Sequence, residues 1–205
     1  MIPAALGFRV HSGWAALVAV AGSFPAPEIL DQRRIEIADP HCAGSKQPYH
    51  AAERLKLEDA EKWIARCTES STRLAEQCIT SALQDLASRG FDVITCAVSD
   101  ASGRPLPALA ATLASHALIH TAEGEFFRNV IASVCAQYSL VVTRIKEKEL
   151  LARASTSFAL GPEKLQSVLS GLGRSLGPPW TQDQKFATLL ACLALVPKTA
   201  IHSAG

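Results

Sequence analysis

Three successive segments at the start of the chain predict β-strands: the first two are mainly apolar, and in the third apolar and polar positions alternate. The segments are Ala4–Val10, Trp14–Val20 and Glu28–Ala38. Turn residues 11–13 separate the first two, and a loop over residues 22–27 precedes the third. The third segment has one mixed face, which is typical of an edge strand. Three strands joined by short connections predict an antiparallel meander.

After the meander the apolar period changes from two residues to three or four, which predicts a long helix over residues 51–88. The residues of this helix expected to face the sheet are Trp63, Cys67, Leu74 and Cys78. Short apolar runs at Val93–Val98 and Leu140–Ile145 then predict buried parallel strands. Further helices are expected over residues 109–119, 121–138, 146–157, 162–172 and 181–195, with Thr181 as the N-cap of the last.

This order predicts an α/β fold: a mixed five-stranded sheet, with a three-strand meander followed by strand–helix alternation and with helices on both faces. The first strand is expected in the centre, between the second strand and Val93–Val98.

The order of elements resembles the ribonuclease H-like fold, and within that fold it is most similar to RuvC-type Holliday junction resolvases. The likeness includes the opening strand around Gly7 and a closing helix after the Pro-rich break at residues 177–179. It covers most of the chain as an order of elements and implies a single domain over residues 1–205.

The resemblance also implies acidic residues that bind divalent metals, at four positions of the family pattern. Here those positions fall near Arg9, at or near Asp100, at Asp183 and at Phe186. Two-metal phosphodiester chemistry needs several carboxylates that converge on the cations. Because Arg9 puts a positive charge where a metal would bind, we expect a repurposed, non-nucleolytic domain that binds a partner or a small ligand. The alternative is a metal-dependent phosphodiester hydrolase acting on nucleic acid, with Asp100, Glu123, Glu125 and Asp183 as catalytic residues.

A second candidate site lies between the fourth and fifth predicted strands. On one continuous helix, His116, His120 and Glu123 would share a face, at positions i, i+4 and i+7. Two imidazoles and a carboxylate in this spacing are suitable ligands for Zn²⁺ or Fe²⁺, so a divalent metal is the cofactor that the sequence indicates. In the alternative interpretation, Thr121 caps a new helix and the histidines form local hydrogen bonds.

Ligand binding is expected near the ends of the strands. Arg9 and His11 flank the first turn and, with Arg33 and Arg34 on the third strand, could form an anion site. Alternatively, Arg33 and Arg34 belong to a solvated strand edge that is protected against aggregation. Arg104 follows the fourth strand, where parallel sheets bind ligands, although a plain turn also fits this loop.

Composition narrows the class of protein without assigning a function. The chain has 205 residues, of which 48% are hydrophobic, and this is too apolar for a disordered chain. The net charge of +1 does not favour nucleic acid or an anionic membrane as a partner, although a local basic patch would still allow nucleic acid. Self-association stays open.

The cysteines and the N-terminal segment bear on the compartment. Six cysteines without CxxC spacing are typical of buried thiols in a reducing compartment, so we expect a cytoplasmic protein. The apolar run at residues 14–21 imitates a signal peptide, but we expect it to form a strand hairpin with residues 4–10. This run is too short to span a bilayer.

Overall fold

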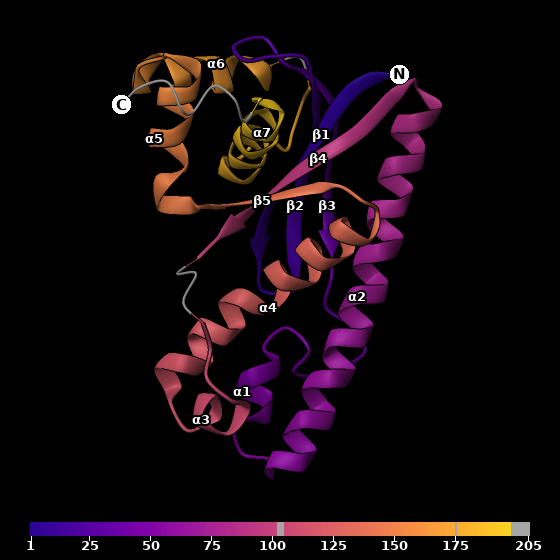
Figure 1. The fold of residues 1–205 in the computed structure, drawn as a ribbon, viewed down its shortest axis with the longest axis vertical. Helices are drawn as coiled ribbons and strands as arrows, with labels where there is room; N and C mark the ends of the chain where they lie inside the picture. The colour runs from indigo at the N-terminus through magenta and orange to yellow at the C-terminus, as the bar shows by residue number, and fades with distance from the viewer. Residues whose placement is uncertain (102–104, 175, 198–205) are drawn as a thin grey trace.

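The computed structural model describes residues 1–101, 105–174 and 176–197 (Figure 1). Its elements are, in chain order, β1 (Ile2–His11), β2 (Trp14–Ala21), β3 (Glu28–Glu36), α1 (Pro48–Ala52), α2 (Leu57–Ser88), β4 (Phe91–Asp100), α3 (Leu109–Leu113), α4 (His116–Gln137), β5 (Val141–Lys146), α5 (Glu147–Phe158), α6 (Pro162–Leu172) and α7 (Gln182–Leu195). Each of the five predicted strands is present.

The five strands form one mixed sheet in the order β3-β2-β1-β4-β5. β1 pairs antiparallel with β2, and β2 pairs antiparallel with β3, so the meander is confirmed. β4 lies parallel to β1 and to β5. The first strand is central between the second and fourth strands, as predicted, and the predicted mixed five-stranded sheet is confirmed.

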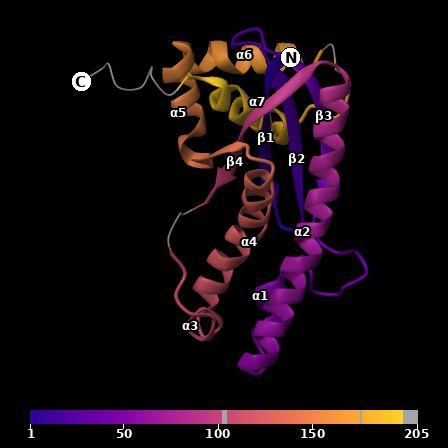
Figure 2. The same ribbon diagram turned by 45° about the vertical axis from the view of Figure 1, so that its right-hand side comes forward.

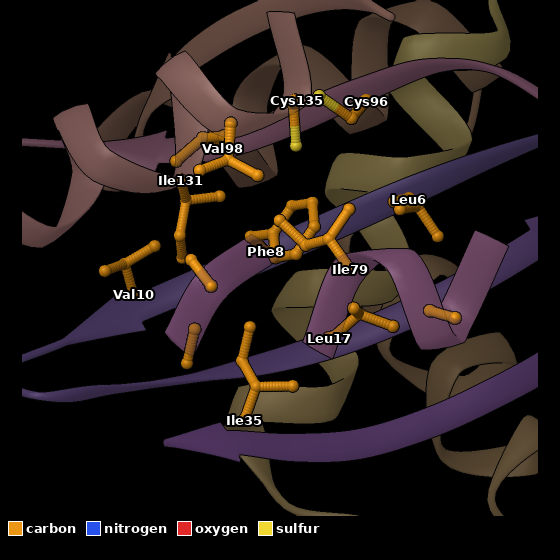
Figure 3. Packing of buried hydrophobic residues seen from close by; sticks show 14 of the residues in the cluster. Leu6, Phe8, Val10, Leu17, Ile35, Ile79, Cys96, Val98, Ile131 and Cys135 are labelled. Carbon is orange, nitrogen blue, oxygen red and sulfur yellow. The ribbon is translucent and has the colours of Figure 1, made fainter. Parts of the chain in front are cut away.

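Alternation along β1 divides the core into two layers. Leu6, Phe8 and Val10 belong to a cluster with α2 and α4, and Figure 3 shows side chains such as Ile79 and Ile131 meeting them. Ala5 lies on the opposite face, in a cluster with α7. Arg9 has the same parity as Ala5, so its side chain also points toward α7.

The buried face of α2 is shifted from the predicted one. Cys67 is buried as expected, but the positions that enter the core further along the helix include Ala75 and Ile79, one residue after Leu74 and Cys78. Leu74 and Cys78 are half-buried, and Cys78 packs against the core cluster together with Trp63. Small residues such as Ala75 let the helix approach the sheet closely.

Two helix boundaries also differ from the prediction. The helix expected from residue 51 to 88 is interrupted, and its first part is the five-residue α1, with Pro48 at its first position. The Trp63 side chain, expected against the sheet, is half-buried, and its Nε1 donates to the Pro48 carbonyl at 2.8 Å. The expected break before residue 121 lies earlier, because α4 begins at His116.

No helix in the described ranges is both long and apolar enough to cross a membrane.

All six cysteines are free thiols, and four of them are buried. Burial raises the pKa of Cys67 to about 11 and the pKa of Cys192 to about 12. A hydrogen bond with Cys96 and burial both raise the pKa of Cys135. These thiols stay protonated at neutral pH and serve as small apolar side chains.

Gly7 is required by the contact between β1 and α7. A Cβ atom at this position would lie 1.9 Å from the Ala187 carbonyl oxygen and 2.7 Å from the Ala191 nitrogen, both backbone atoms of α7. We expect Gly7→Ala to lower the free energy of unfolding by about 1–3 kcal/mol or more, measured by chemical denaturation.

Gly171→Ala is the matched control, because no heavy atom lies within 4 Å of a Cβ at this position in α6. Alanine there should leave stability unchanged or raise it by up to about 1 kcal/mol. Equal stability of the two variants would contradict the close approach of α7 to β1.

Candidate functional site

Charged side chains from six elements meet at the carboxyl ends of the parallel strands. β1, β4 and β5 run in the same direction, so their carboxyl ends lie at one edge of the sheet. Ligands of α/β proteins commonly bind at this edge. The charged residues here, which we call the edge network, are Arg9, Asp100, Glu125, Arg128, Arg144, Glu147 and Asp183.

Arg9 is the centre of one half of the edge network. Its Nη1 donates to Asp183 Oδ1 at 2.8 Å, and its Nη2 donates to Glu147 Oε2 at 3.3 Å. The guanidinium carbon lies 4.6 Å from the centroid of the Phe186 ring. The Thr181 hydroxyl accepts from the Asp183 backbone N–H in a capping box, which fixes Asp183 in the first turn of α7. Only 18% of the Arg9 side chain is exposed, so the guanidinium is held by its partners and not by water.

His11 joins Arg9 on Asp183, whereas Arg33 and Arg34 do not. His11 Nε2 lies 2.8 Å from the same Asp183 oxygen, and its ring stacks on Trp14 with centroids 4.2 Å apart. Arg34 lies over the other ring of this stack, 3.7 Å from the Trp14 centroid, and pairs with Glu36. Arg33 pairs with Asp31 and Asp85. These four residues therefore do not converge on one anion site.

Arg144 on β5 is the centre of the other half. It lies 3.0 Å from Glu125 Oε2 and 3.4 Å from Asp100 Oδ1, and it donates to Asn129 Oδ1 at 2.8 Å. Three of the four residues expected to be catalytic, Asp100, Glu125 and Asp183, are thus ion-paired to arginines.

Arg128 on α4 lies between the two halves. Its Nε donates to the Ser99 carbonyl at 3.0 Å, and its Nη2 lies 3.8 Å from Glu147 Oε1. Burial lowers the pKa of Arg128, while the charges of Glu147, Glu125 and Asp100 raise it. The attraction from carboxylates of both halves makes the edge network electrostatically continuous.

The residues of this edge do not fit a pair of divalent cations. Each of the four carboxylates has a guanidinium nitrogen within 3.4 Å, so a metal ion bound to any of them would lie close to an arginine. At an effective dielectric of 20, a positive charge 4 Å from an arginine is repelled by about 4 kcal/mol per unit charge. The edge network is therefore suited to holding strands and helices together.

A separate group of three histidines lies beyond this edge, where α1 meets the start of α4 (Figures 1 and 2). The group contains His50, His116 and His120, and one ligand nitrogen from each lies within 4.8 Å of the others. The Nε2 atoms of His116 and His120 are 3.0 Å apart. The alternative in which Thr121 caps a new helix is wrong, because Thr121 lies inside α4 and donates to the Ala117 carbonyl.

Glu123 lies behind the histidines and touches only one of their side chains, that of His50. Its Oε1 accepts from the backbone N–H groups of Tyr49 at 2.7 Å and His50 at 2.9 Å, and it lies 3.2 Å from His50 Nδ1. Burial raises the pKa of Glu123, and these hydrogen bonds oppose the rise. The structure therefore places Glu123 next to a histidine of the group and outside the set of converging ligand atoms.

Sequence reasoning did not select His50, Arg128, Arg144 or Glu147. The position of Pro48 was the one usable signal, because proline favours the first turn of a helix and His50 follows within that turn. Glu147 lies in the first turn of α5, inside the helix predicted over residues 146–157, and nothing in the local sequence indicates its partners on β1 and α4. Arg104, expected to bind a ligand, lies outside the described residues.

No protein-family model matches this chain, and no curated protein matches it. Among solved structures, RuvC from Thermus thermophilus in complex with a Holliday junction substrate is similar, at 10% identity and a TM-score of 0.48 over 93% of this chain and 90% of that chain. A second Thermus thermophilus RuvC structure is similar at 11% identity and a TM-score of 0.47, over 93% of this chain and 92% of that chain. The Aquifex aeolicus member of the Ppx/GppA family is similar at 10% identity and a TM-score of 0.37, over 78% of this chain and 40% of that chain.

Removing the Arg9 guanidinium should destabilise the fold. Arg9→Met leaves Asp183 and Glu147 partly buried without this cation, so we expect the free energy of unfolding to fall by about 1–3 kcal/mol. Lys62→Met, which removes an exposed pair with Glu58, should change it by about 0.5 kcal/mol or less. Urea denaturation of both variants measures the difference, and equal losses would contradict a structural role for Arg9.

Proposed function

We propose that this chain is a ribonuclease H-like domain that acts by binding a partner or a small ligand and does not cleave phosphodiester bonds. The observation that carries the proposal is the arginine partner of every carboxylate in the edge network. In two-metal cleavage, carboxylates neutralise the cations that stabilise the attacking and leaving oxygens. Here guanidinium groups already neutralise these carboxylates.

The shape of the edge supports the same conclusion. The Arg9 guanidinium stacks on the Phe186 ring. Both residues occupy positions where the family pattern has acids, so neither position supplies a carboxylate. Asp183 Oδ1 contacts both Arg9 and His11. A metal ion bound to this oxygen would compete with both contacts.

A cleavage assay tests this proposal directly. The element order resembles that of junction resolvases, so the substrates are a four-way DNA junction and an RNA–DNA hybrid, each with Mg²⁺ and with Mn²⁺. We expect no cleavage above that of a protein-free blank, and no shift of the melting temperature on adding Mg²⁺, because the acids of the edge network are paired with arginines.

Substitutions separate true cleavage from contamination. Asp183→Asn and Asp100→Asn remove acids of the edge network, and Asp92→Asn removes an exposed acid of β4 as the control. Cleavage by the wild-type chain that persists in Asp92→Asn and disappears in Asp183→Asn or Asp100→Asn would overturn the proposal. Junction binding without cleavage would support it and identify nucleic acid as the partner.

A further inference from the structure

We propose that His50, His116 and His120 form a binding site for one divalent transition-metal ion, with Zn²⁺ as the best match. This inference goes beyond the proposed function and does not depend on it, because the three histidines lie on α1 and α4 and belong to no ion pair of the edge network. We call this group the histidine centre.

The spacing of the ligand atoms fits a metal ion. Imidazole nitrogens bind Zn²⁺ at about 2.0–2.1 Å, so two ligands of a tetrahedral centre lie roughly 3.3–3.4 Å apart. The Nε2 atoms of His116 and His120 are 3.0 Å apart, and the nitrogen contributed by His50 completes a set within 4.8 Å. Small side-chain rotations would bring three nitrogens to metal distance.

Glu123 supplies the contact that a metal-binding histidine requires from its second nitrogen. His50 Nδ1 lies 3.2 Å from Glu123 Oε1, and a proton on Nδ1 donated to this oxygen would leave the Nε2 lone pair for a metal ion. The same carboxylate oxygen holds the backbone N–H groups of Tyr49 and His50, which fixes the position of the ring. Glu123 is therefore a positioning residue and not a ligand.

The charge of Glu123 is an independent indication of a cation. This carboxylate is 7% exposed, and its Oε2 is buried without a hydrogen-bond partner among the described residues. Over the same part of the chain, no lysine or arginine forms an ion pair with it, in contrast to Glu125 on the same helix. A buried carboxylate is stabilised by a nearby positive charge, and a metal ion in the histidine centre would provide one.

Three imidazoles select the kind of ion. Nitrogen ligands suit Zn²⁺ and its neighbours among the transition metals, whereas Mg²⁺ and Ca²⁺ prefer oxygen ligands. No fourth His, Cys, Asp or Glu joins the set within the described ranges, and His116 and His120 are exposed. The fourth position is therefore open to water or to an added ligand, as in zinc sites that exchange a ligand.

Titration calorimetry of the full chain, after treatment with a chelator, tests the histidine centre with Zn²⁺ and with Mg²⁺. We expect one Zn²⁺ per chain and no heat from Mg²⁺. His50→Ala and His120→Ala should each weaken Zn²⁺ binding by more than about 100-fold, which is beyond the roughly 10- to 100-fold loss expected for Glu123→Gln. His41→Ala, the control, removes an exposed histidine outside the group and should bind like the wild type.

Co²⁺ provides a second readout, because its visible absorption reports nitrogen ligands in a tetrahedral site. The wild type and His41→Ala should show these bands, and His50→Ala and His120→Ala should lose them. Absence of Zn²⁺ binding by the wild type, or binding that survives either substitution, would overturn the proposal. Circular dichroism of each metal-free variant checks folding, and if His50→Ala does not fold, the exposed His120 decides the outcome.

Discussion

Helix α7 can lie on the centre of the sheet because β1 presents Gly7 there, with no space for a Cβ atom beneath the α7 backbone. This contact also sets the position of the edge network. From Gly7 to Arg9 the strand advances by roughly 6.6 Å, and from Ala187 back to Asp183 the helix advances by about 6 Å. The two rises match, so Arg9 meets the first turn of α7.

Helix α4 serves two groups of residues through two acids that are close in sequence. Glu123 and Glu125 are two positions apart, which turns their side chains about 200° from each other around the helix axis. Glu125 reaches Arg144 at the sheet, while Glu123 reaches the start of α1. Helix α4 thus connects two regions. In the edge network arginines neutralise the acids, whereas Glu123 has, within the described ranges, only a histidine as an ionic partner.

The parts of this structure that depend on local periodicity could be predicted from the sequence. The strands followed from alternation, and the shared helix face of His116 and His120 followed from their spacing. His50 could not be assigned, because tertiary packing brings it to His116 across 66 positions of sequence. The partners of Arg9 come from α5 and α7, and no local pattern reports such distances.

The edge network also affects which sequences this domain can reach by single substitutions. An aspartate at position 9 would face Asp183 and Glu147 without their cation and would leave Arg128 and Arg144 in place. Each intermediate between the present residues and a metal-binding edge would carry unbalanced, partly buried charge. Because the arginines and acids of this edge depend on one another, several positions must change together before any one change is favourable.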